Sequence, residues 1–138
     1  MHSYSKLFPV ILAGALTACG GNTDVEESLY AGTYQTAVQL TATTCTGITV
    51  QNQPTTVQHQ AGSSSITLRH ASQDYTGTVD AAGAFTTVPK AISAGNATHT
   101  LTIGGRFAGG GFTADVQAQV TSTGAPACTY TVHWIGTR

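Results

Sequence analysis

The sequence predicts an all-β fold: a single antiparallel up-and-down β-barrel of about eight strands, with a β-sandwich as the alternative. Three observations support this prediction. Apolar and polar side chains alternate with a period of two beyond Gly32, and no segment after residue 18 repeats apolar residues every 3.6 positions. Charged residues make up only 8% of the chain while Thr, Val and Gly are frequent, a composition typical of exported β-rich domains. Finally, two cysteines fall where the first and last strands of such a barrel would meet.

The first expected strand begins at Gly32 and has Tyr34, Val38 and Leu40 on one face and polar side chains on the other. The following segment, residues 43–53, is expected to be a loop with room for a short additional strand. Proline cannot donate a ladder hydrogen bond, so Pro54 argues against a central strand at this point.

Two hairpins are expected next. Residues 55–60 and 65–70 should pair across a two-residue turn at Gly62-Ser63, and this register sets Val57 opposite Leu68 and His59 opposite Ile66.

The second hairpin should join residues 75–79 to residues 85–88 through a loop in which Gly83 supplies a positive φ. Residues 90–97 contain Gly95 and Asn96 and are interpreted as a connection between strands.

The clearest hairpin joins residues 99–107 to residues 112–120 across the glycines at 109–111. Each strand has one mostly apolar face, and one register brings the two faces together along their whole length. The pairs that this register predicts are Phe107 with Phe112, Ile103 with Val116, and Leu101 with Ala118.

The last strand starts at Cys128 and places Tyr130, Val132 and Trp134 on its inner face. In an even-stranded meander, the first strand ends and the last strand begins at the same end of the sheet. Cys45 and Cys128 therefore meet if the first strand closes onto the last, which also removes both exposed edges. Cys45 is out of phase with the inner face of its strand, so it requires a β-bulge or a position just past the strand end.

The segment around Cys19 resembles the signal peptide of a bacterial lipoprotein. Lys6 precedes an apolar stretch, Leu7 to Ala18, that is too short to span a bilayer as a helix. Leu16-Thr17-Ala18-Cys19 resembles a lipobox, whose cysteine is lipidated and becomes the new N-terminus. The resemblance implies a signal peptide over residues 1–18, lipidated Cys19 with a flexible tether over residues 19–30, and a β-barrel domain over residues 31–138.

The same resemblance implies a location in the cell envelope, held to a membrane by the lipid on Cys19. Gly20 follows that cysteine where lipoproteins kept in the inner membrane tend to have Asp, so the outer membrane is favoured. Cys45 and Cys128 are expected to form a disulfide bond in this oxidising compartment. The alternative is two unpaired buried thiols; neither cysteine has a second Cys or a His at a spacing usual for metal ligands.

Catalytic side chains are scarce in the expected barrel. It contains no Glu, and its three Asp residues lie at turns (Asp74 and Asp80) or on an outer face (Asp115). The sequence contains none of the usual motifs that pair a nucleophile with a base. We therefore expect neither an enzyme nor a cofactor, and without a basic patch we expect no nucleic-acid partner.

Three inward-facing side chains are the candidate ligand-binding residues: His70, Tyr75 and His99, which the meander places on one rim of the barrel. His59 falls at the opposite end. Two strands separate His70 from His99, so we expect no metal site.

Two hypotheses for function follow. The first is a non-enzymatic envelope lipoprotein with a structural or surface-exposed role. The alternative is a periplasmic barrel that binds a small apolar ligand or inhibits a hydrolase, since the architecture resembles lipocalin-like and avidin-like barrels and small envelope inhibitors of lysozyme or proteases. A small-ligand binder should contain a cavity of a few hundred Å³ open at one rim, on the order of known ligand sites. A structural protein should be filled, and an inhibitor should project a loop, for which residues 43–54 are the best candidate.

Overall fold

The structure is a computed structural model in which residues 28–138 are described; the predicted signal peptide, Cys19 and most of the predicted tether lie outside the described residues. All regular structure in the described part is β-strand. The nine strands are β1 (Gly32–Thr43), β2 (Gln53–Gln58), β3 (Ser65–His70), β4 (Gln73–Val79), β5 (Ala84–Thr87), β6 (Lys90–Ala94), β7 (Ala97–Ala108), β8 (Gly111–Ser122) and β9 (Ala125–Thr137).

Eight of these strands close into an antiparallel barrel, which confirms the predicted fold class. The closing contacts are β1 with β9 and β5 with β7. The ninth strand, β6, pairs with the part of β7 that extends beyond β5, so β5 and β6 share one edge of β7.

The strand β6 corrects the interpretation of residues 90–97 as a connection. Ala94 pairs with Ala97, so Gly95 and Asn96 form a two-residue hairpin turn, with Gly95 at a φ of 62°. Its Ala-Ile-Ser-Ala sequence alternates too weakly in hydrophobicity to identify a strand without the partner β7.

Two smaller expectations are also corrected. Pro54 lies within β2, as its second residue, where it pairs with Gln35; a proline near a strand end removes little from the ladder. The β2–β3 turn is centred on Ala61-Gly62, because the Ser63 N–H donates to the Gln60 carbonyl at 3.0 Å.

The strand registers agree with the sequence prediction. Val57 pairs with Leu68, and the β7–β8 hairpin has all three predicted pairs, Phe107 with Phe112, Ile103 with Val116, and Leu101 with Ala118. The position of His59 differs: it lies beyond the end of β2 and has no strand partner.

The predicted link between the first and last strands is present. Cys45 is bonded to Cys128, with a Cα–Cα distance of 5.2 Å. The register of β1 against β9 shifts between Leu40 and Ala42, and β1 ends at Thr43. The out-of-phase cysteine is thus accommodated by both predicted devices, a bulge and a position past the strand end.

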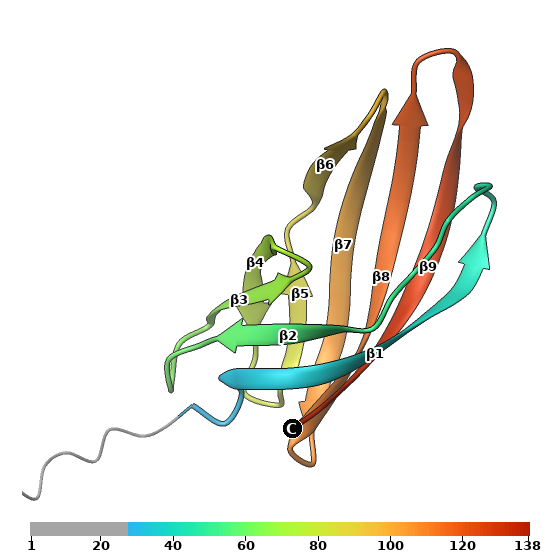
Figure 1. The fold of residues 1–138 in the computed structure, drawn as a ribbon. Helices are drawn as coiled ribbons and strands as arrows, with labels where there is room; N and C mark the ends of the chain where they lie inside the picture. The colour runs from blue at the N-terminus through green and yellow to red at the C-terminus, as the bar shows by residue number, and fades with distance from the viewer. Residues whose placement is uncertain (1–27) are drawn as a thin grey trace, which may run out of the picture.

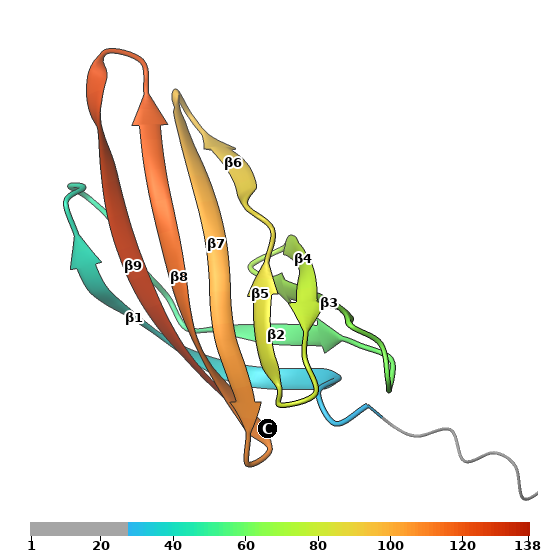
Figure 2. The ribbon, with the colours of Figure 1, turned by 180° about the vertical axis from the view of Figure 1, so that it is seen from behind.

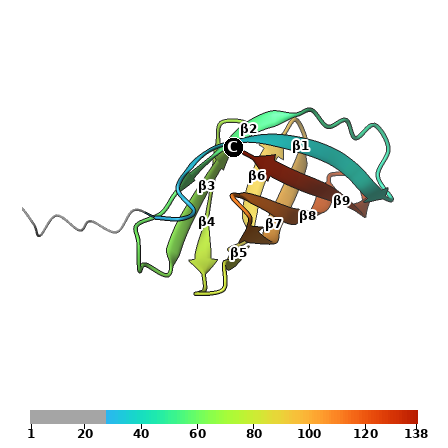
Figure 3. The ribbon, with the colours of Figure 1, turned by 90° about the horizontal axis from the view of Figure 1, so that it is seen from below.

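The wall of the barrel is tall on one side and short on the other. Strands β7, β8 and β9 continue well beyond the region where β2, β3, β4 and β5 form the opposite wall (Figures 1 and 2). We call the end that holds the C-terminus and the start of β1 the closed end, and the other the open end; Figure 3 views the molecule from the closed end. The segment 44–52, between β1 and β2, returns from the tall wall to the short one.

Candidate functional site

Two pockets lie at the ends of the barrel, one toward each end. The first, which we call the Tyr30 pocket, has a volume of about 430 Å³ and lies at the closed end. The second, the His70 pocket, has a volume of about 340 Å³ and lies at the open end. Their walls differ in kind.

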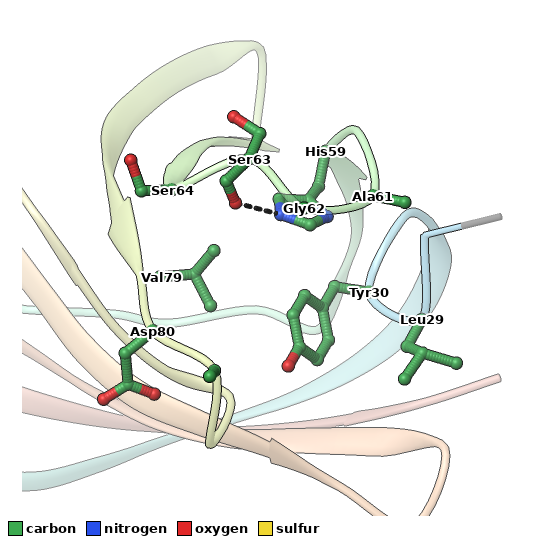
Figure 4. Close-up of a pocket in the computed structure, with 10 residues that line it drawn as sticks. Leu29, Tyr30, His59, Ala61, Gly62, Ser63, Ser64, Val79 and Asp80 are labelled. Atoms are coloured by element: carbon green, nitrogen blue, oxygen red, sulfur yellow. Dashed lines mark hydrogen bonds between the residues drawn. The ribbon is translucent and has the colours of Figure 1, made fainter. Parts of the chain in front are cut away.

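Turns form most of the Tyr30 pocket (Figure 4). Its lining includes residues 61–64 of the β2–β3 turn and residues 79–81 at the end of β4 and beyond it, with Leu29 and Tyr30 on the other side. The Tyr30 ring stacks on Phe107 with centroids 4.7 Å apart.

His59 forms hydrogen bonds that hold residues 28–31 in place. Its Nδ1 lies 2.6 Å from the Ser28 Oγ, and its Nε2 lies 2.7 Å from the Ser63 carbonyl oxygen, an acceptor. The Ser28 Oγ accepts the N–H groups of Tyr30 and Ala31, both at 3.1 Å. Nε2 is therefore the protonated nitrogen, and His59 fastens residues 28–31 across the end of the barrel.

Regular strands and one loop enclose the His70 pocket. Its lining residues come from seven strands, all except β5 and β6, and from the loop 44–52. The strand residues are Val38, Gln53, His70, Tyr75, Leu101, Val116, Tyr130, Val132 and Trp134, joined by Ala71 and residues 48–51. None of them is Asp, Glu, Lys or Arg.

His70 is buried in this pocket, with 7% of its surface exposed. Its ring stacks on Trp134, with centroids 4.1 Å apart and an interplanar angle of 26°. Its Nδ1 lies 2.9 Å from the Thr55 Oγ1. Burial lowers the pKa of His70 to about 4, so the imidazole is neutral near pH 7.

Two phenols complete the aromatic lining. Tyr75 is 4% exposed, and its pKa is raised by burial and, secondarily, by the nearby Tyr130. Burial also raises the pKa of Tyr130, whose hydroxyl lies 2.9 Å from the His99 Nδ1. Both phenols are therefore neutral near pH 7.

The structure separates the three residues that the sequence singled out. His70 and Tyr75 both line the pocket, whereas His99 lies behind Tyr130 and is not part of the lining. Sequence reasoning did not single out Trp134 or Tyr130 for the site. The alternation predicts that both face inward from the last strand, but it does not report that Trp134 stacks on His70 across the barrel.

The loop 44–52 lies against the pocket and is held at both ends. The disulfide bond fixes Cys45 to β9, and the Asn52 Oδ1 accepts the Val38 N–H at 2.9 Å. Between them, Val50 packs against the hydrophobic core. The loop is therefore one wall of the pocket.

Within residues 28–138, no helix is long and apolar enough to cross a bilayer. The same described residues contain no group of three or more His, Cys, Asp or Glu side chains that could hold a metal ion.

Comparisons with protein-family models, with curated proteins and with solved structures found no match to this chain.

Proposed function

We propose that this protein is an envelope lipoprotein whose barrel binds a small, uncharged, largely apolar ligand at its open end. The observation that carries the binding proposal is the His70 pocket, about 340 Å³ in volume and lined by seven strands and a loop. This volume falls within the range of roughly 300–1,000 Å³ that small-molecule sites occupy.

The lining supports an uncharged ligand. A charged molecule entering an apolar pocket loses its hydration and needs an opposite charge in compensation, and the lining of the His70 pocket offers none. The few polar groups among aromatic and aliphatic side chains are the usual means of orienting a mostly apolar molecule.

The two other functions considered from the sequence are less favoured. A purely structural barrel is expected to have a filled interior, and the His70 pocket is open space among core residues. A hydrolase inhibitor is expected to project the segment 43–54, yet Val50 in this segment packs against the core and residues 48–51 line the pocket.

The envelope location rests on the resemblance of Leu16-Thr17-Ala18-Cys19 to a lipobox. The Cys45–Cys128 disulfide bond is consistent with an oxidising compartment. Mass spectrometry of the mature protein should find cleavage before Cys19 and a diacylglyceryl group on its sulfur. An uncleaved chain or an unmodified Cys19 would contradict the proposed location in the envelope.

Ligand binding can be tested with N-phenyl-1-naphthylamine, an uncharged dye that fluoresces strongly in apolar surroundings. We expect saturable fluorescence with the barrel domain, and a marked loss in Val38→Phe, because Val38 lines the His70 pocket and a larger side chain there reduces its volume. The matched control is Ala61→Phe, which places the same ring in the Tyr30 pocket. Equal binding by Val38→Phe and the wild type, or loss only in Ala61→Phe, would refute the proposed site.

A further inference from the structure

A chain of three buried polar side chains runs beneath the His70 pocket. The Thr36 Oγ1 lies 2.7 Å from the Thr55 Oγ1, which lies 2.9 Å from the His70 Nδ1. Thr36 is 3% exposed and Thr55 is fully buried. Buried polar groups need hydrogen-bond partners, so these three side chains form hydrogen bonds with one another.

The direction of the hydrogen bonds in this chain follows from the group at its far end. The Thr36 hydroxyl also lies 3.5 Å from the Tyr34 carbonyl oxygen, which can only accept. If Thr36 donates to that carbonyl, it accepts from Thr55, and Thr55 accepts from His70; all three hydrogen bonds form. The reverse direction forms only two, because Thr36 would then donate to Thr55 instead of to the Tyr34 carbonyl oxygen.

The favoured direction fixes the tautomer of His70. The neutral ring then carries its hydrogen on Nδ1, and Nε2 has a free lone pair. Nε2 makes no hydrogen bond with any described residue, and among the described residues no fully buried side-chain N or O atom lacks a partner. Nε2 is therefore accessible, and His70 lines the pocket.

We infer that the ligand of the His70 pocket is an uncharged aromatic molecule that donates one hydrogen bond, from O–H or N–H, to the Nε2 of His70. The inference rests on the proposed binding function and names its ligand class. The aromatic part follows from the lining, in which Tyr75, Tyr130 and Trp134 present rings. The hydrogen-bond donor on the ligand follows from the lone pair on the Nε2 of His70. A ligand that covers this nitrogen without donating to it leaves a buried acceptor unpaired, which weakens binding.

The test compares two probes, p-cresol and 4-methylanisole, by isothermal titration calorimetry. They share the ring, the methyl group and the oxygen, and only p-cresol has a hydrogen to donate. We expect p-cresol to bind on the order of 10-fold more tightly to the wild type. In His70→Phe, which keeps an aromatic ring against Trp134, the ratio should fall toward 1 while 4-methylanisole still binds.

The tautomer is measured separately, by ¹⁵N NMR of the His70 ring in the folded wild type. Protonated Nδ1 and unprotonated Nε2 are expected. In Thr55→Val the acceptor for Nδ1 is lost, so the preference for this tautomer and for p-cresol should decrease together. The probe pair and the nitrogen spectrum of the wild type decide the question even if His70→Phe does not fold.

The outcomes separate the two proposals. Equal binding of both probes, or a hydrogen on Nε2, would overturn the donor inference and leave the binding function standing. Failure of both probes and of the naphthylamine dye to bind would overturn the binding function itself.

Discussion

The two ends of this barrel are built from the same alternating strands, yet they differ in where their hollow lies. At the closed end the strand side chains pack together and the pocket lies outside them, among turns, whereas at the open end the pocket lies among the strand side chains themselves. At the closed end, aromatic rings interlock: Phe112 contacts Tyr34 edge-on with centroids 5.1 Å apart, and Phe107 lies 4.9 Å from Phe85. A Cβ added to Gly136 would lie 2.1 Å from the Phe112 Cε1, so a glycine is required under that ring. At the open end, Val38, Leu101 and Tyr130 are only partly buried.

The alternation of apolar and polar residues determines which side chains face the interior. The height of the opposite wall determines whether those side chains pack against others. At the closed end β4 and β5 stand opposite the tall strands. Toward the open end the short strands stop, while β7, β8 and β9 continue (Figure 1). The loop 44–52 covers part of this gap, and the uncovered remainder is the His70 pocket.

Of the changes considered, removing the disulfide bond should cause the largest loss of stability, and it should loosen the open end more than the closed end. The bond closes a separation of 83 residues, and on the chain-entropy model its loss costs roughly 4.5 kcal/mol of unfolding free energy. We expect Cys45→Ser/Cys128→Ser to lower the denaturant midpoint and to speed hydrogen exchange in residues 43–53 relative to the closed end. Uniformly faster exchange at both ends would contradict the assignment of this bond to the open end.

A pair of truncations compares the two ends directly. Phe112→Ala at the closed end should cost about 4 kcal/mol, because its ring is 3% exposed and surrounded by other rings. Leu101→Ala at the half-buried open end should cost about 1–2 kcal/mol, because less of its surface is removed from water. Urea unfolding of both variants gives the two values, and similar losses would mean that the ends do not differ in packing.

Acid should destabilise the open end through His70. Its pKa is lowered from 6.5 to about 4 in the folded state, so the unfolded chain binds the proton more tightly. His70 therefore does not lower the unfolding free energy above about pH 6.5. As the pH falls below that value the unfolding free energy decreases, by about 3 kcal/mol near pH 4. In His70→Gln this part of the pH dependence should vanish, whereas the surface pair of His133 and Asp115 remains and cancels in the comparison. Parallel pH profiles would show that His70 is not buried as described.

The smallest predicted effect concerns the turn at the mouth of the pocket. Ala71 and Ser72 join β3 to β4 with φ angles of 48° and 65°, a conformation that favours Asn and Gly. Ala71→Asn/Ser72→Gly should therefore raise the unfolding free energy by about 1 kcal/mol. Thermal unfolding measures the change, and a lower midpoint would argue against this turn geometry.

Much of the fold could be predicted from the sequence, because strong alternation and two cysteines together determine register and closure. The pairs of the β7–β8 hairpin and the β1–β9 contact follow from these signals. The strand β6 could not be found in this way, since its side chains are small and only its pairing with β7 defines it.

The candidate site was less accessible to sequence reasoning. Inward phase identified His70 and Tyr75, but it also suggested His99, which lies behind Tyr130. The stacking of His70 on Trp134 joins strands far apart in sequence, and no local pattern reports such a contact. The volume of the pocket depends on how far each wall of the barrel extends. The alternation of apolar and polar residues does not predict this.

The most direct test of the central claim, that the open end is the binding end, uses the single tryptophan of the chain. Trp134 lines the His70 pocket, so its indole N–H resonance should shift saturably as p-cresol is added to the ¹⁵N-labelled barrel domain. The amide resonances of Ala61 and Gly62 in the Tyr30 pocket should stay unchanged. Saturable shifts at Ala61 and Gly62 with none at Trp134 would contradict the account.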